Sequence, residues 1–209
     1  MGNEIIIMGY SGHGFVICDV CERNNLTIIG YCDNEEKSLN PYQLAYLGNE
    51  NEPAIIEQLR SISYFIAIGN NKIRAKIQAN LIQKGLPLAI NLIHPSAQLS
   101  TKIQLSRGIL IAPNVVINPL AAISEGVICN TASVIEHEVK IGKYSFIGPN
   151  ATLLGAVEVG DFSFVGANAV VKEGVKIGNN VTIGAGSVVI KDVKDNQTVV
   201  GNPQRIIKQ

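Results

Sequence analysis

The sequence is poor in aromatic and charged residues. Among 209 residues there is no Trp, aromatic side chains make up 5% and charged side chains 16%, and 17 basic residues balance 17 acidic ones. A nucleic-acid-binding protein usually presents a basic face. The composition therefore argues against a nucleic-acid partner.

Long apolar runs and secretory features are also missing. The chain starts MGNEIIIMGYSGHG, in which a short apolar run meets a glycine loop without a basic leading segment. We therefore expect neither a signal peptide nor membrane insertion. Position 6 is Ile, so the N-myristoylation pattern fails. Cys18, Cys21, Cys32 and Cys129 do not form a disulfide framework, and we expect a cytoplasmic protein.

A six-residue repeat dominates the second half of the chain. Every sixth residue from Leu99 to Val189 is aliphatic or Cys, and the row two residues earlier, from Ala97 to Ser187, is small or apolar. This period is typical of a parallel β-helix, in which three short faces form a coil of about eighteen residues. Both rows should point inward, and each buried aliphatic side chain contributes roughly 1.5–3 kcal/mol.

The first part of the chain alternates strands and helices instead. The expected strands are Glu4–Met8, Thr27–Tyr31, Tyr64–Ile68 and Leu88–Ile93, and the expected helices are Phe15–Arg23, Pro53–Arg60 and Lys72–Lys84. The last helix should turn Ile73, Ile77, Leu81 and Ile82 inward. This α/β alternation predicts a small Rossmann-like domain over residues 1–93, followed by a β-helix domain over residues 94–209.

The glycine loop between the first strand and helix is the first candidate site. Its backbone N–H groups and the helix dipole can meet a phosphate. Asp33 closes the second strand, where a ribose hydroxyl is often held. The spacing is GxxGxG and the domain is short, which favours a mononucleotide over NAD. The alternative is a tight turn that needs glycine only for steric reasons, with His13 merely solvated.

The second candidate site surrounds His137, which is the only histidine in the repeat. It follows Ile135 by two positions, off both inward rows, so it should face outward. The adjacent Glu138 can orient the imidazole and make it more basic, as suits a general base that takes a proton from an amine or hydroxyl. Gly155, one coil later, leaves space beside the ring. The alternative is a solvent-exposed histidine on a charged face.

We expect no metal. A zinc site in the repeat would need several histidines, and the pair Cys18 and Cys21 has no second ligand pair at a suitable spacing. These two cysteines also lie inside the expected helix instead of at its N-terminus, which weakens a redox role. We interpret them as buried or half-buried thiols.

Six motifs together resemble a known family. They are GYSGHG at the first loop, YCDN and IAIGNN at two strand ends, HPSA at the domain junction, CNTASVIEHE in the repeat and VGNPQRIIK near the end. Across essentially the whole chain, the sequence resembles the bacterial sialic-acid O-acetyltransferase and nucleotide-aminosugar N-acetyltransferase family. Members of that family N-acetylate UDP-4-amino-sugars in bacillosamine synthesis, or GDP-perosamine.

The resemblance implies a left-handed β-helix, a homotrimer, and acetyl-CoA bound in a groove between subunits. It implies that His137 is the base, Glu138 its modulator, and Asn130 a hydrogen-bonding group near the reacting atoms. Carried over in the same way, the nucleotide would be held by Ser11, Gly12, His13, Asp33 and Asn34, with Gly69 lining that pocket. The acetyl-CoA groove would be lined by Gly155, Ala167 and Ala185, and by Phe146, which stands where bacillosamine-type members have a second histidine.

The expected function is acetyl-CoA-dependent N-acetylation of a nucleotide-linked aminosugar, of the UDP-4-amino-4,6-dideoxy type, in bacterial glycan biosynthesis. Two alternatives remain. One is O-acetylation of sialic acid or a related sugar, and the other is a non-catalytic trimeric scaffold that binds nucleotide sugars. Besides Phe146, the chain departs from the bacillosamine type at Asn34, where that type has a second acid after the second strand.

Overall fold

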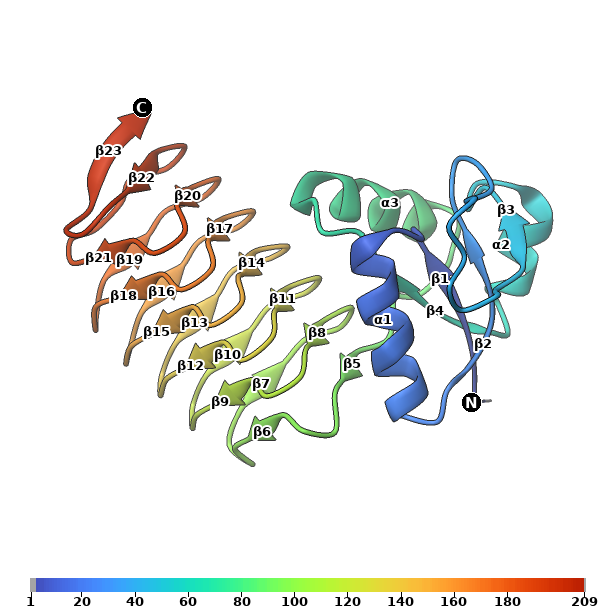
Figure 1. Ribbon diagram of the computed structural model, residues 1–209, viewed down its shortest axis with the longest axis horizontal. Helices are drawn as coiled ribbons and strands as arrows, with labels where there is room; N and C mark the ends of the chain where they lie inside the picture. Colours follow the sequence, from blue (N-terminus) through green and yellow to red (C-terminus); the bar gives the residue numbers. More distant parts are fainter. Residues whose placement is uncertain (1–2, 209) are drawn as a thin grey trace. The chain divides into compact units, whose positions relative to one another are not determined.

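The computed structural model describes residues 3–208, and the chain divides into two compact units, residues 1–92 and 93–209 (Figure 1). The sequence places this boundary one residue later. In the part of the chain that the structure describes, no helix combines the length and apolar composition needed to cross a bilayer.

The first unit is a four-stranded parallel sheet with helices, as predicted. Its strands lie in the order β3-β2-β1-β4. The elements are β1 (Glu4–Met8), α1 (Gly12–Arg23), β2 (Thr27–Cys32), β3 (Tyr46–Gly48), α2 (Pro53–Gln58), β4 (Ser63–Ile66) and α3 (Asn71–Gln83). The core forms where Ile6, Met8, Tyr64 and Ile66 of the central strands meet Leu81 of α3. The Rossmann-like prediction is therefore confirmed.

Helix α3 turns Leu81 and the partly buried Ile77 inward, as predicted, but not the other two residues of the predicted face. Ile73 and Ile82 are 49% and 46% exposed, while Arg74 and Gln78 are buried. The buried polar groups are satisfied: Arg74 donates to the carbonyl oxygens of the β4–α3 loop, and Gln78 Nε2 donates to the hydroxyl of Tyr64 at 2.8 Å. Hydrogen bonding thus overrides the apolar periodicity.

One strand prediction in the first unit is wrong, and one strand was missed. Residues 88–91 form no strand, and β5 (Leu92–Ile93) pairs in the sheet of the second unit instead. The reason is visible in the spacing, because Ile93 precedes Leu99 by six residues and so continues the inward row. The short edge strand β3 was not predicted, because three residues carry too little alternation to identify it.

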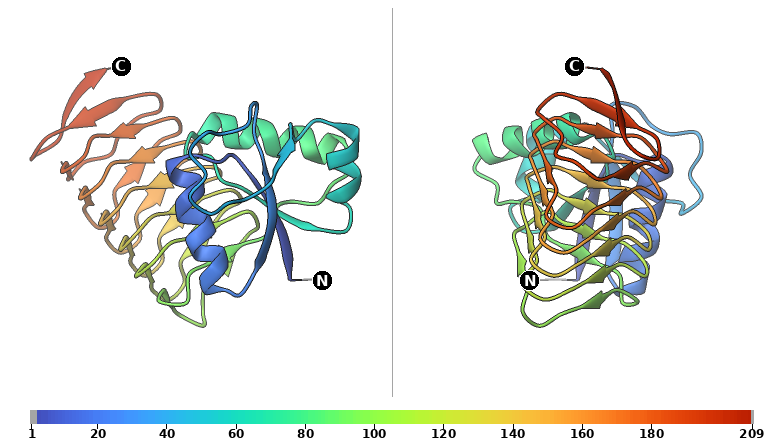
Figure 2. Two further views of the ribbon diagram at one scale, coloured as in Figure 1. Left: turned by 45° about the vertical axis from the view of Figure 1, so that its right-hand side comes forward. Right: turned by 90° about the vertical axis from the view of Figure 1, so that its left-hand side faces the viewer.

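The second unit is a parallel β-helix with three faces. The right-hand view of Figure 2 shows the coils stacked in sequence, from green at the bottom to red at the top. Face 1 contains β5, β8 (Leu110–Ile111), β11 (Ile128–Cys129), β14 (Phe146–Ile147), β17 (Phe164–Val165), β20 (Thr182–Ile183), β22 (Thr198–Val200) and β23 (Arg205–Lys208). Face 2 contains β6 (Gln98–Leu99), β9 (Val116–Ile117), β12 (Val134–Ile135), β15 (Thr152–Leu153), β18 (Val170–Val171) and β21 (Val188–Val189). Face 3 contains β7 (Gln104–Leu105), β10 (Ala122–Ile123), β13 (Lys140–Ile141), β16 (Glu158–Val159) and β19 (Lys176–Ile177).

The two inward rows form the core of the β-helix, as predicted. From Ile109 to Val189, every member of both rows is buried, and only the members in the first coil are half-buried. Up to the last coil, each strand pairs with the one eighteen residues later, so like side chains stack on like, for example Ile123 on Ile141, whereas β20 and β22 pair at a separation of sixteen residues. This register supplies a continuous apolar column without a conventional layered core.

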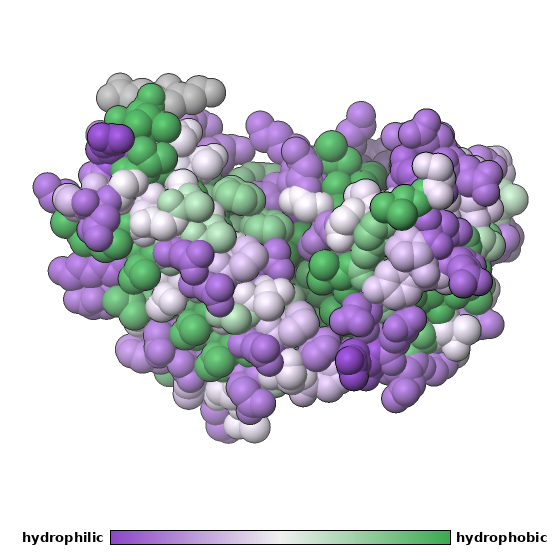
Figure 3. All heavy atoms as spheres, in the orientation of Figure 1, coloured by the Kyte–Doolittle hydropathy of each residue, from purple (hydrophilic) through white to green (hydrophobic). Residues whose placement is uncertain are grey.

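The last strand ends the stack differently. Strand β23 runs antiparallel to β22, and the side chain of Gln204 accepts hydrogen bonds from the backbone of Ile190 and Lys191. Ile206 and Ile207 are 51% and 60% exposed, and Figure 3 shows apolar side chains on the surface at this end of the chain. The final coil is thus covered by an edge strand that leaves apolar surface open.

One residue at each corner between two faces adopts a left-handed backbone conformation. The positive φ angle recurs at every sixth residue from Gly108 to Gly186. Gly and Asn fill many of these positions, but Leu120, Ala132, Glu138, Tyr144, Ala156 and Phe162 do so as well. A non-glycine residue there costs roughly 1–2 kcal/mol. The stacked register must therefore offset local strain at these corners.

Two buried serines of the second inward row differ in their hydrogen bonds to neighbouring backbone. Ser163 Oγ donates to the carbonyl of Gly178 at 2.7 Å and accepts from the amide of Val181 at 3.0 Å. Within residues 3–208, the buried Ser133 Oγ has no hydrogen-bond partner. The two serines therefore occupy equivalent positions in the six-residue repeat, but within this described range only the hydroxyl of Ser163 has hydrogen-bond partners.

We predict opposite effects of two matched substitutions on the free energy of unfolding. Ser163→Ala should lower it by about 1–3 kcal/mol, because a carbonyl and an amide lose their partner, whereas Ser133→Ala should raise it by about 1 kcal/mol, because an unpaired hydroxyl is removed. Urea unfolding followed by circular dichroism measures both. Equal destabilisation by the two substitutions would contradict this hydrogen-bond assignment.

Candidate active site

His137 and Glu138 form a hydrogen-bonded pair at the corner between faces 2 and 3. The distance between His137 Nδ1 and Glu138 Oε2 is 3.1 Å, and the side chains are 59% and 57% exposed. A carboxylate on Nδ1 favours the tautomer with the proton on that nitrogen, which leaves Nε2 as an acceptor. Within the described residues, Nε2 makes no hydrogen bond. The pair can therefore accept a proton from a ligand.

Gly155 fixes the imidazole ring from the next coil. A Cβ atom at Gly155 would lie 2.6 Å from His137 Cε1 and 2.7 Å from Nε2. The ring itself thus occupies the space that the missing side chain leaves. Backbone hydrogen bonds hold the two turns together, since the amide of Ala156 donates to the carbonyl of His137 at 2.9 Å. Gly155 therefore acts first as a platform for the imidazole.

Glu138 is one of the residues in the left-handed conformation, with φ of 63°. Its amide donates to the carbonyl of Pro119 at 3.0 Å, which ties the turn to the previous coil. Strained backbone often occurs at functional sites, where the surrounding structure maintains it. Here the same conformation recurs at every corner of the repeat, and at Glu138 it carries the carboxylate that pairs with His137.

The other residues predicted to act with His137 lie elsewhere on the same subunit. Asn130, Ala167 and Ala185 lie at the corner between faces 1 and 2, at the opposite edge of face 2 from His137. The side-chain oxygen of Asn130 accepts from the amide of Thr131 at 2.8 Å. Phe146 lies on face 1 and stacks on Phe164 with ring centroids 5.0 Å apart. Within one subunit, the structure brings only Glu138 and Gly155 to His137.

The glycine loop of the first unit leads directly into helix α1. The helix begins at Gly12, earlier than the predicted Phe15, and Ser11 is its N-cap residue without a side-chain capping bond. Within the described part of the chain, the buried Nε2 of His13 has no hydrogen-bond partner. Burial, followed by the charge of Arg74, lowers the pKa of His13 from 6.5 to about 4. His13 is therefore neutral at physiological pH.

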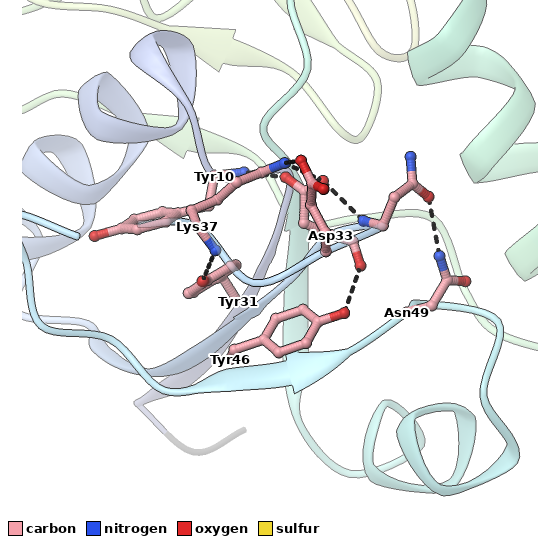
Figure 4. A network of polar contacts seen from close by, with 8 residues as sticks. Tyr10, Tyr31, Asp33, Lys37, Tyr46 and Asn49 are labelled. Carbon is pink, nitrogen blue, oxygen red and sulfur yellow. Dashed lines mark hydrogen bonds and ion pairs between the residues drawn. The ribbon is translucent and has the colours of Figure 1, made fainter. Parts of the chain in front are cut away.

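Asp33 ties the second strand to the glycine loop. Its carboxylate accepts from the amide of Tyr10 at 3.1 Å and pairs with Lys37 Nζ at 3.2 Å (Figure 4). Asn34, next in the chain, accepts a hydrogen bond at its side-chain oxygen from Asn49 at 3.1 Å, and the hydroxyl of Tyr46 donates to the carbonyl of Asp33. If Asp33 binds a ribose hydroxyl, as predicted, its carboxylate does so while it also holds the amide of Tyr10 and Lys37.

A cavity of about 610 Å³ opens beside Asp33 in the first unit. Its lining residues are Met8, Gly9, Cys32, Asp33, Asn34, Glu50, Asn51, Ile68, Ile73, Lys76, Ile77, Ala79, Asn80 and Gln83. Of the predicted nucleotide-binding residues, this lining contains Asp33 and Asn34. It does not contain Ser11, Gly12, His13 or Gly69, as far as the described residues go. The carbonyl oxygen of Gly69 instead accepts a hydrogen bond from Arg74 Nη1 at 3.1 Å.

Sequence reasoning missed most of this lining. The residues from α3 recur at helical spacing on one face of that helix, and they mix aliphatic with polar side chains. Of these residues, only Ile73 and Ile77 are interpreted from the sequence, as part of the inward face of the helix. The exposed Ile73 is the signal that the face is available to a ligand.

The cysteines do not add chemistry to either site. All four are free and buried, and burial raises the pKa of each thiol to about 12. Cys18 and Cys21 are thus buried thiols, as interpreted from the sequence. Among the described residues, no group of three or more His, Cys, Asp or Glu side chains could hold a metal ion.

Comparison with known families matches both units. Residues 4–81 match the PglD N-terminal domain, residues 138–171 match the hexapeptide repeat of succinyl-transferase, and residues 156–191 match the bacterial transferase hexapeptide (six repeats).

Solved structures match the whole chain. PerB from Caulobacter crescentus, in complex with CoA and GDP-perosamine, is 31% identical with a TM-score of 0.89 over 97% of this chain and 96% of that one. The acetyltransferase domain of PglB from Neisseria gonorrhoeae, in complex with acetyl coenzyme A, is 26% identical with a TM-score of 0.91 over 99% and 100%. WeeI from Acinetobacter baumannii, at 23% identity and a TM-score of 0.86, shares the fold. These matches confirm the predicted left-handed β-helix.

The lowered pKa of His13 predicts a pH dependence of stability. The unfolded chain takes up a proton at this residue near pH 6.5, while the folded chain does so only near pH 4. Between these values the unfolded state binds more protons, so the free energy of unfolding should fall as pH falls, by up to about 3 kcal/mol in total.

Urea unfolding at several pH values between 4 and 7 measures this slope. His13→Gln should flatten it, because the amide that replaces the imidazole does not titrate in this range. An unchanged slope in His13→Gln would show that His13 is not the titrating group.

Proposed function

We propose that this chain transfers the acetyl group of acetyl-CoA to the amino group of a nucleotide-linked sugar. The premise is that the chain belongs to the family of sugar acetyltransferases with a PglD N-terminal domain and hexapeptide repeats. The observation that carries this proposal is the His137–Glu138 pair, held against Gly155 with Nε2 available to a ligand. The 31% identity to a protein solved with CoA and GDP-perosamine supports the substrate class.

The proposed reaction is a direct transfer. The sugar amine attacks the thioester carbonyl, a C–N bond forms, and the C–S bond breaks. His137 Nε2 takes a proton from the attacking nitrogen, and this proton then neutralises the departing CoA thiolate. Glu138 stabilises the imidazolium that forms between these steps, because its carboxylate remains on Nδ1.

The first unit supplies the nucleotide-binding part of this proposal. The N-terminus of α1 carries free backbone N–H groups suited to a diphosphate, and the cavity beside Asp33 lies at the carboxyl ends of the strands, where ligands of such sheets bind. The resemblance favours a UDP-linked 4-amino-4,6-dideoxy sugar. A panel of UDP-linked and GDP-linked 4-amino sugars with sialic acid separates N-acetylation from O-acetylation.

His137→Ala should lower kcat/KM by about 10²–10⁴-fold, the usual contribution of a general base. Release of CoA from acetyl-CoA in the presence of the acceptor sugar measures the rate. Lys102→Ala, an exposed substitution two coils away, serves as the control and should keep the wild-type rate. Wild-type kcat/KM in His137→Ala would contradict the assigned role.

We also propose that the enzyme is a homotrimer. His137 and Gly155 lie at one corner of the β-helix, while Asn130, Ala167 and Ala185 lie at another. If all of them contact acetyl-CoA or its acceptor, as the resemblance implies, the second corner must come from a neighbouring copy. A closed ring of three copies places one such pair of corners at each interface.

A mixing experiment tests this arrangement. His137→Ala and Ala167→Trp should each be inactive as pure proteins, the first without a base and the second with a blocked groove. Subunits refolded or exchanged together should recover about a quarter of wild-type activity, because random pairing rebuilds one interface in four. Activity that stays at the level of the pure variants would show that each subunit carries a complete site.

A further inference from the structure

The cavity of the first unit has the position and the volume of a nucleoside-binding pocket. It lies at the carboxyl ends of β1 and β2, between the residues after β2 and helix α3. In Rossmann-like sheets this crevice accommodates the nucleoside end of the ligand. Its volume of about 610 Å³ is sufficient for a base and ribose.

Aliphatic side chains form one wall of the cavity. Ile68 follows β4, and Ile73 and Ile77 lie on the same side of α3. Ile73 is 49% exposed, although aliphatic residues on a helix of this kind are normally buried against the sheet. A planar aromatic base stacked on this wall would cover the exposed surface.

The side chain of Asn51 is the amide of the lining whose oxygen and nitrogen are both used. The side chain of Asn51 accepts from Asn80 and from Lys84, and it donates to Asn49 at 2.8 Å and to Glu50 Oε1 at 3.2 Å. These bonds hold the loop before α2 to α3. They leave the amide of Gln83, Asn80 Oδ1 and Asn34 Nδ2 for a ligand, among the described residues, and these groups carry no charge.

Two charged groups remain available in the same lining, Glu50 Oε2 and Lys76 Nζ. Among the described residues, neither atom has a hydrogen-bond or ion-pair partner. The wall of the cavity near Cys32 carries the carboxylates of Glu50 and Asp33, which add to burial, together with Glu52, in raising the pKa of the Cys32 thiol. Such a wall attracts hydrogen-bond donors of a ligand and repels its carbonyl oxygens.

The bases differ in what they offer to a carboxylate. Guanine presents two adjacent donors, N1–H and the 2-amino group, on one edge, and two acceptors, O6 and N7, on the other. Uracil flanks its single N3–H donor with two carbonyl oxygens, and the cytosine amino group stands beside an acceptor nitrogen. Only guanine matches a carboxylate with a paired donor edge and an ammonium group with a paired acceptor edge.

We propose that Glu50 is a specificity-determining residue that selects a guanine nucleotide, with Lys76 on the O6 and N7 side. This inference rests on the proposed function, and it replaces the UDP-linked acceptor favoured by resemblance with a GDP-linked one. It also gives the exposed Ile73 a role, as the apolar surface on which the base stacks.

Binding of free nucleoside diphosphates to the full-length protein tests the proposal without turnover. Isothermal titration calorimetry with GDP, UDP and inosine diphosphate gives three dissociation constants, and inosine diphosphate lacks only the 2-amino group of guanine. GDP should bind at least about tenfold more tightly than either of the others. Two ratios of dissociation constants follow, UDP to GDP and inosine diphosphate to GDP. Glu50→Ala should reduce both ratios towards one, mainly by weakening the binding of GDP.

Glu57→Ala is the matched control, because Glu57 is a 79% exposed residue on α2 outside the cavity, and it should leave both ratios unchanged. UDP binding as tightly as GDP, or ratios that survive Glu50→Ala, would overturn the selection of guanine. Failure of all three diphosphates to bind would overturn it as well. The proposed function is judged separately, since it fails only if no nucleotide-linked aminosugar is acetylated.

Discussion

The structure depends on the stacking of each coil on the coil eighteen residues away. Side chains of the inward rows bury one another only in this register, as Ile123 does on Ile141. The same register provides the hydrogen bonds that hold the corners, where left-handed backbone would otherwise be costly. A slip of one residue would expose the apolar rows and would also separate His137 from Gly155.

The chemistry is placed at positions where the repeat is locally strained or incomplete. Glu138 occupies a corner conformation that suits Gly or Asn, and its carboxylate reaches His137 from there. Gly155 lacks the side chain that would collide with the imidazole ring. In the first unit, the polar positions of α3 leave Ile73 exposed beside a cavity. These three departures from the ideal pattern coincide with proposed ligand contacts, whereas others, such as the positive φ of Leu120 and Phe162, do not.

Periodicity made the β-helix and its inward rows predictable, because a six-residue repeat has few structural explanations. The outward direction of His137 followed from the same count. The cavity could not be found this way, because Arg74 and Gln78 are buried through hydrogen bonds to groups distant in sequence. The strand at Leu92 was assigned to the wrong sheet, because its place depends on pairing with β8. The roles predicted for Asn130, Ala167 and Ala185 stay predictions.

The most direct test of the account is the product formed from acetyl-CoA and a nucleotide-linked 4-amino sugar. Mass spectrometry of the sugar nucleotide, with parallel measurement of CoA release, follows both halves of the reaction. The account predicts one acetyl group gained on the amine for each CoA released. Absence of any acetylated sugar nucleotide across GDP-linked and UDP-linked acceptors would contradict it.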